Sequence, residues 1–179
     1  MFVWVGVDVD EQLQEIKSVA KEAEERIGFV HSNFTLPLHV SLKMSFAVDE
    51  KEFDAVVETL AGFFKTLSPI DVGVKGIELL DGIVWIRLQE SEALNAVHDQ
   101  LNDLLSRRFG VGLHAYDCDY QFHTTLFMDR AQEKLERAHG MVMNAPLPPA
   151  FCLRRFVIGC SSSGELGSYR VYRRIDRER

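Results

Sequence analysis

The alternation of hydrophobic and polar positions predicts short strands interleaved with amphipathic helices along the whole chain. Apolar residues that recur every three or four positions predict helices, which cover residues 10–27, 53–64, 94–105 and 135–142. Runs rich in β-branched and aromatic residues predict strands, which cover residues 3–7, 36–46, 70–80, 83–86, 121–128, 151–158 and 168–175. The mixture of both element types indicates an α+β protein.

The order of predicted elements occurs twice. Trp4 and Trp85 occupy the first strand of each copy, and the helix-capping patterns that begin at Asp49 and Asp129 occupy matching places later in each copy. The predicted divisions are a first half-repeat over about 1–81, a second over about 82–167, and a last strand over about 168–175. We therefore expect a single bilobal domain over 1–179, a duplicated fold in which two antiparallel sheets with outer helices surround a central groove.

Composition and charge limit the classes of partner. The chain has 179 residues, of which 46% are hydrophobic and 26% charged, as in a soluble globular protein. The net charge is −7, and the excess of acidic residues lies in the first half. Long duplex nucleic acid is not expected as a partner, because it requires a broad basic face, although a pocket for one phosphate is compatible with this balance.

The chain shows no signal for membrane insertion or for a disulfide framework. No apolar run approaches the roughly 18 residues that a membrane span needs, and the first ten residues lack the basic segment of a signal peptide. The three cysteines form no Cys-x-x-Cys pair. We expect a cytoplasmic, monomeric protein without membrane contact.

Two short motifs of one type occur in matching places of the two halves. Residues 38–42 read Leu-His-Val-Ser-Leu, and residues 122–126 read Phe-His-Thr-Thr-Leu. Positions i and i+2 of a strand project from the same face, so each motif presents one imidazole and one hydroxyl together and buries its apolar flanks. The residues concerned are His39 with Ser41 and His123 with Thr125.

Two imidazoles and two hydroxyls suit acid–base chemistry at a phosphate. If an approximate two-fold axis relates the halves, both pairs meet at one point. A neutral imidazole can then take a proton from the attacking group, a protonated one can give a proton to the leaving oxygen, and the hydroxyls can bind non-bridging oxygens. A single histidine in a strand is more often structural, so it is the paired occurrence that favours a shared active site without a metal.

With these motifs the chain resembles the two-histidine phosphoesterases, in particular their 2′–5′ RNA ligase-like and cyclic-nucleotide phosphodiesterase branches. The resemblance implies that His39 and His123 are the acid–base pair and that Ser41 and Thr125 bind the phosphate. It also implies that no cofactor is needed and that the substrate is a nucleotide or short RNA with a 2′,3′-cyclic phosphate or a 2′–5′ linkage.

Two departures from the family pattern bear on the substrate. Ser41 stands where Thr is commoner, which keeps the hydroxyl but loses the methyl group that restrains χ1. Ligase-like members often carry an Arg shortly after the second motif, and residues 127–129 of this chain read Phe-Met-Asp. Regular alternation places Lys43 on the face of His39 and Ser41, so Lys43 is predicted to supply a positive charge to the phosphate.

Other residues give weaker indications. Residues 111–120 form a polar connection before the second motif, and Tyr116 and Tyr120 are predicted either to stack on a base or simply to pack. The remaining histidines lack the spacing of a zinc site, so no metal is expected; they are His31, His98, His114 and His139.

Two alternative functions remain open. One is the same chemistry on a small-metabolite cyclic phosphate, which the acidic first half favours. The other is a non-catalytic protein that binds a nucleotide or RNA end, against which the two intact motifs argue.

Overall fold

The computed structural model describes residues 1–29, 32 and 34–178 and confirms the mixed helix and strand content. Its strands are β1 (Phe2–Asp8), β2 (His39–Ala47), β3 (Ile70–Leu80), β4 (Ile83–Leu88), β5 (His123–Met128), β6 (Ala150–Leu153), β7 (Arg155–Ser161) and β8 (Arg170–Asp176). Its α-helices are α1 (Gln14–Ile27), α2 (Phe53–Thr66), α3 (Glu92–Phe109) and α4 (Gln132–Val142).

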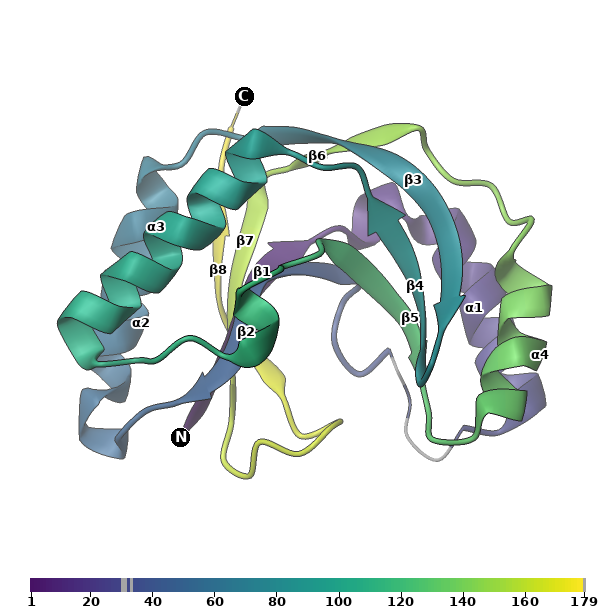
Figure 1. The fold of residues 1–179 in the computed structure, drawn as a ribbon, viewed down its shortest axis with the longest axis horizontal. Coiled ribbons are helices and arrows are strands. Elements are labelled where there is room, and N and C mark those ends of the chain that lie inside the picture. Colours follow the sequence, from purple (N-terminus) through teal and green to yellow (C-terminus); the bar gives the residue numbers. More distant parts are fainter. Residues whose placement is uncertain (30–31, 33, 179) are drawn as a thin grey trace.

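The strands form one antiparallel sheet rather than two separate sheets. The order is β6-β3-β4-β5-β2-β1-β7-β8, and the strands arch between two groups of helices (Figure 1). At the centre, β5 and β2 are joined by a single residue pair, Val40 with Thr124. The two halves of the arch are thus linked by a short stretch of hydrogen bonding, and the two His-containing strands lie at that link.

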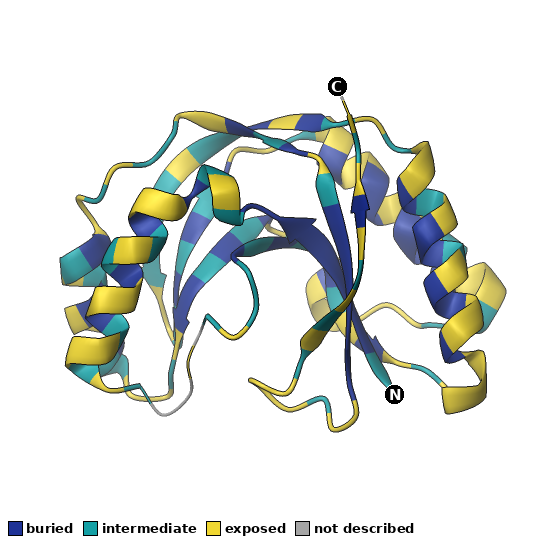
Figure 2. Ribbon diagram, turned by 180° about the vertical axis from the view of Figure 1, so that it is seen from behind, coloured by how far each residue is buried: buried dark blue, intermediate teal, exposed yellow. Residues whose placement is uncertain are grey.

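The helices cover the two halves of the arch in pairs. Helices α2 and α3 lie on the half that contains β2, β7 and β8, and α1 packs with α4 on the half that contains β3 to β5 (Figure 1). Each helix buries one apolar stripe, such as Ile16, Ala20 and Ala23 of α1, and leaves its outer face exposed (Figure 2). Burial of these stripes against the strands makes the core.

The arrangement of elements differs from a division of the chain into two consecutive halves. Helix α3 follows β4 in the sequence but packs on β2. Strand β7 pairs with β1, and β8 pairs with β7. The strand order is symmetric about the β5–β2 pair, with β4 and β1 next on either side. A duplicated unit would produce such symmetry; the duplication and its boundary near residue 81 stay predictions.

The prediction of one strand over residues 151–158 is wrong. The chain forms two strands there, with Arg154 between them: β6 pairs with β3, and β7 pairs with β1. Hydrophobic pattern does not show which partner a strand finds, so one apolar run was predicted as one strand. Because a single residue separates β6 from β7, the edge of one half of the arch continues directly into the other half.

Local signals at turns and helix starts had mixed outcomes. The predicted turn at residues 81–82 connects β3 to β4, and Gly82 has a φ of 77°, a value that favours glycine. The second capping pattern is wrong: α4 begins at Gln132 itself, while the Asp129 carboxylate accepts a hydrogen bond from the Ala131 amide at 2.8 Å. Across the described part of the chain, no helix is long and apolar enough to cross a membrane.

Candidate active site

The two His motifs lie on adjacent strands at the centre of the arch. Val40 and Thr124 face each other and are fully buried, so the residues on either side of them project from the opposite face of the sheet. Extending the register by one residue sets His39 opposite Thr125 and Ser41 opposite His123. All four side chains are half-buried and belong to the same face.

Both imidazoles are held in the same way. His39 donates from Nδ1 to the carbonyl oxygen of Pro37 at 2.8 Å, and His123 donates from Nδ1 to the carbonyl oxygen of Gln121 at 2.7 Å. A carbonyl oxygen only accepts hydrogen bonds, so Nδ1 carries the hydrogen in each ring. In the neutral form Nε2 then holds a lone pair, which leaves that nitrogen able to take a proton from a substrate or from water.

Each imidazole also lies against a tryptophan of the neighbouring strand. The ring centroids of Trp4 and His39 are 4.3 Å apart, and those of Trp85 and His123 are 4.2 Å apart. The repeated Trp was visible in the sequence as a spacing, but that spacing alone assigned it no place in the site. The structure shows that the Trp of β1 or β4 covers the histidine of the adjacent strand.

Burial sets the ionisation of both histidines. Removal from water lowers the pKa of His39 to about 4; the Pro37 carbonyl and the carboxylate of Asp10 oppose this shift, and positive charge on His123 adds to it. Burial likewise lowers the pKa of His123, against the effect of the Gln121 carbonyl. Both rings therefore favour the neutral form.

A cavity of about 230 Å³ adjoins the motifs. Three of the four motif residues line it, namely His39, Ser41 and Thr125, while His123 lies outside its lining. Apolar side chains supply much of the rest of the wall, including Met44, Met128 and Leu166. The cavity therefore combines the polar side chains of the motifs with an apolar wall.

The role of Lys43 at the phosphate stays a prediction: the residue lines the cavity, but not through the regular alternation from which the role was inferred. A β-bulge interrupts the β1–β2 pairing, because Gly6 is opposite Ser41 whereas Val5 is opposite Lys43. The extra residue, Leu42, ends the regular alternation on which the prediction rested. The Lys43 side chain is 2% exposed, and its ammonium is bonded within the protein.

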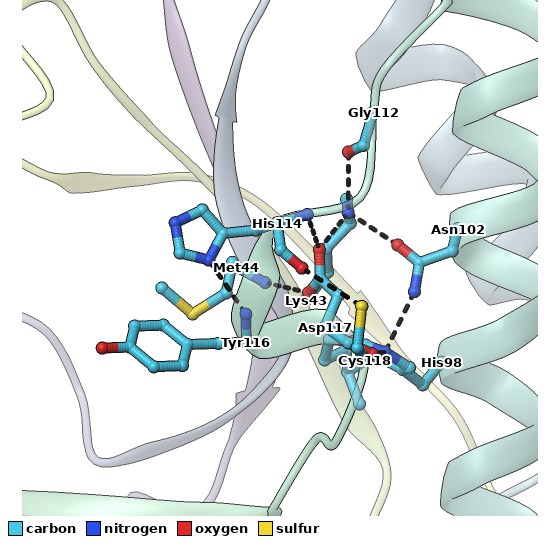
Figure 3. A network of polar contacts seen from close by, with 10 residues as sticks. Lys43, Met44, His98, Asn102, Gly112, His114, Tyr116, Asp117 and Cys118 are labelled. Carbon is cyan, nitrogen blue, oxygen red and sulfur yellow. Dashed lines mark hydrogen bonds and ion pairs between the residues drawn. The ribbon is translucent and has the colours of Figure 1, made fainter.

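The Lys43 ammonium belongs to an internal polar network (Figure 3). It donates to Asp117 Oδ2 and to Asn102 Oδ1, both at 2.6 Å, and approaches the Gly112 carbonyl at 3.5 Å. Burial alone would raise the pKa of Asp117, but the Lys43 ammonium and the amides of His114 and Met44 hold it below its usual value. The network ties the connection between α3 and β5 to strand β2.

The two tyrosines of that connection have different surroundings. Tyr116 is 69% exposed, and its ring lies beside His114 with centroids 5.2 Å apart. The Tyr120 ring stacks on His98, with ring centroids 4.5 Å apart, and burial raises the pKa of its hydroxyl. Base stacking by Tyr116 stays a prediction, whereas Tyr120 uses a ring face for packing, the other alternative that the sequence allowed.

The other histidines that the structure describes lie on different elements. His98 is buried in the polar network, and its Nδ1 lies 2.8 Å from the Leu42 carbonyl oxygen. His114 begins the short 3₁₀ turn Ala115–Asp117, His139 lies in α4, and His31 lies outside the described residues. In the described part of the chain, no group of three or more His, Cys, Asp or Glu side chains is arranged to hold a metal ion.

The lowered pKa values of both histidines predict an acidic pH optimum. In a two-histidine mechanism, kcat/KM is highest midway between the two pKa values of the free enzyme. Each shift is downward from 6.5, so the optimum lies below 6.5 whichever histidine is the base. Initial rates measured across the acidic and neutral range check this, and Ser41→Ala should leave the optimum in place. An optimum at or above neutral pH would contradict the expectation.

Comparison with known proteins agrees with this architecture. In this chain one antiparallel sheet carries one His-x-Ser/Thr motif on each of its two central strands. The sequence profile of the 2′-5′ RNA ligase superfamily matches residues 5–159, and the chain belongs to this superfamily. No curated protein sequence matches the chain.

Solved structures with the same fold have diverged far in sequence. E. coli LigT complexed with NADP+ is 14% identical, with a TM-score of 0.64 over 99% of this chain and 97% of that chain. TT0787 of Thermus thermophilus is 17% identical, with a TM-score of 0.65 over 98% of this chain and 97% of that chain. At these identities the likeness shows the fold alone.

Proposed function

We propose that the chain is a metal-independent phosphoesterase that acts on a 2′,3′-cyclic phosphate or a 2′–5′ phosphodiester of a nucleotide or RNA end. The observation that carries the proposal is the placement of His39 and His123 on one face of adjacent strands, each with Nδ1 bonded to a backbone carbonyl and Nε2 left for chemistry. Membership of the superfamily supports it. So does the binding of 3′-AMP by E. coli LigT, a protein of the same fold.

The proposed reaction uses the residues as follows. For a 2′,3′-cyclic phosphate, one neutral imidazole removes a proton from water through Nε2 while the water oxygen attacks phosphorus. The other imidazole, protonated, gives its proton to the 2′ or 3′ oxygen as the bond from phosphorus to that oxygen breaks. Ser41 and Thr125 donate hydrogen bonds to the non-bridging oxygens, where negative charge increases in the transition state. Water is added across the bond, and the product is a phosphomonoester.

A small cyclic phosphate is a second candidate substrate, and one observation favours it. Among the described residues that line the cavity, Lys43 is the one Lys or Arg, and its charge is balanced by Asp117. A polyanionic RNA gains much of its binding energy from free basic side chains. A single phosphodiester attached to a small apolar group does not require them.

A substrate panel tests both candidates. The panel comprises a 2′,3′-cyclic mononucleotide, an oligonucleotide with a 2′,3′-cyclic end, a 2′–5′ linked dinucleotide and ADP-ribose 1″,2″-cyclic phosphate, each assayed with and without EDTA. We expect turnover of at least one substrate, unchanged by EDTA. Loss of turnover on chelation would point to metal chemistry, and phosphate binding without turnover of any substrate would support the non-catalytic alternative instead.

A further inference from the structure

The Ser41 hydroxyl accepts a hydrogen bond from Trp4. The distance from Trp4 Nε1 to Ser41 Oγ is 3.0 Å. An indole N–H only donates, so Ser41 is the acceptor in this contact and its own hydrogen is not used there. Ser41 lines the cavity, so this hydrogen can be donated to the oxygen of a bound phosphate.

Two glycines, Gly6 and Gly159, leave the space in which the Trp4 ring packs against the sheet. A Cβ atom at Gly6 would stand 2.8 Å from the Trp4 ring and 2.7 Å from the Val40 carbonyl oxygen, and one at Gly159 would stand 2.5 Å from the ring. Real Cβ atoms do not come so close, so only glycine fits at these places on β1 and β7. Trp4 is 5% exposed as a result and has little freedom to move.

The second motif has no equivalent hydrogen bond. Trp85 lies against His123 as Trp4 lies against His39, but its Nε1 donates to Glu78 Oε2 at 3.2 Å. The hydroxyl residue there is Thr125, whose methyl group restrains χ1 by itself. Ser41 has no methyl group. The motif that lacks the internal restraint is thus the one whose hydroxyl is held by the neighbouring indole.

We propose that Trp4 is a positioning residue, which fixes the Ser41 hydroxyl as a donor to the non-bridging oxygen of a bound phosphate. The inference rests on the proposed function for its effect on catalysis, but it also predicts phosphate binding independently of any turnover. Trp4 acts through Ser41, and the indole hydrogen bond does for Ser41 what the methyl group does for Thr125.

Trp4→Phe tests the hydrogen bond while keeping an aromatic ring beside His39. We expect it to weaken the binding of inorganic phosphate, measured by calorimetry, by roughly 2- to 10-fold, the worth of one hydrogen bond. A similar fall is expected in the kcat of any substrate that the panel identifies. The matched variant Trp85→Phe removes a hydrogen bond to Glu78 instead, and should lose less than Trp4→Phe in both measurements.

Double variants separate positioning from a general effect on structure. In the Ser41→Ala background, Trp4→Phe should weaken phosphate binding little further, because the hydroxyl that Trp4 holds is already gone. Ser41→Thr should restore phosphate binding to the Trp4→Phe variant, since Phe is smaller than Trp and the Thr methyl supplies the restraint. If Trp4→Phe fails to fold, Gly159→Ala displaces the indole without removing it and should weaken binding in the same direction.

The outcomes separate this inference from the proposed function. Equal losses for Trp4→Phe and Trp85→Phe, or full additivity with Ser41→Ala, would overturn the role of Trp4 even in an active enzyme. Wild-type protein that turns over no substrate, yet binds phosphate in a manner that depends on Trp4 and Ser41, would overturn the proposed function and leave the positioning role standing.

Discussion

Replacement of either motif histidine is expected to lower kcat/KM by roughly 10²- to 10⁴-fold, the range for loss of one general acid or base. His39→Ala and His123→Ala each remove an imidazole whose Nδ1 is bonded to a backbone carbonyl and whose Nε2 is proposed to transfer the proton. The double variant should lose much less than the product of the two single losses, because the two groups act in one step. Steady-state rates on the best substrate of the panel provide the measurement.

Two comparisons make the histidine experiment specific. His139 lies in α4 outside the cavity lining, so the kcat/KM of His139→Ala should stay close to that of wild type. A phosphodiester with a p-nitrophenyl leaving group needs little protonation, so it should partly rescue the variant that lacks the acid and leave the variant that lacks the base inactive. Retention of most of the activity in His39→Ala, with the fold intact by circular dichroism, is incompatible with two-histidine catalysis.

The buried ion pair between Lys43 and Asp117 carries the largest expected effect on stability. Asp117→Asn leaves the ammonium buried without its counter-charge, and removal of one partner of such a pair typically costs about 3–5 kcal/mol of folding free energy. Lys43 and Asp117 are 2% and 0% exposed at the side chain, so solvent cannot replace the lost partner. Urea-induced unfolding of wild type and variant measures the difference.

An exposed ion pair provides the matched control. Arg107 and Asp103 lie one turn apart on α3, 2.8 Å from each other and largely exposed. Asp103→Asn should lower the free energy of unfolding by on the order of 0.5 kcal/mol or less. The double variant Lys43→Met with Asp117→Asn should regain part of the stability that Asp117→Asn loses, because no charge is then left unpaired. Equal effects of Asp117→Asn and Asp103→Asn would show that the buried network does not hold the fold.

The position of the network gives the same experiment a functional aspect. Asp117 accepts hydrogen bonds from the amide of Met44 on β2 and from the amide of His114 in the connection that carries Tyr116 (Figure 3). Met44 also lines the cavity. Asp117→Asn weakens these contacts. It should therefore raise KM for a substrate that contacts this side of the cavity, in addition to lowering the free energy of unfolding.

The sequence predicted the elements well where a signal was local. Apolar residues at every second position located most strands, and apolar residues at every third or fourth position located the helices. Side-chain burial follows directly from strand and helix geometry. The prediction failed at residues 151–158, because the partner of each strand depends on the path of the chain. The regular alternation expected up to Lys43 is interrupted by a bulge of one residue, which local pattern does not reveal.

The amino-acid sequence alone determined the two His-x-Ser/Thr motifs and the pairing of each imidazole with one hydroxyl, since both follow from the alternation of side chains in a strand. Only the tertiary structure decided that β2 and β5 are neighbours, that Trp4 reaches Ser41 while Trp85 reaches Glu78, and that the Lys43 ammonium is bonded to Asp117. Apart from the contact of Trp85 with Glu78, which lies within the hairpin of β3 and β4, these contacts join residues distant in the chain. Strand order, the bulge and the space left by Gly6 and Gly159 determine them, and none of these is encoded in any local run of residues.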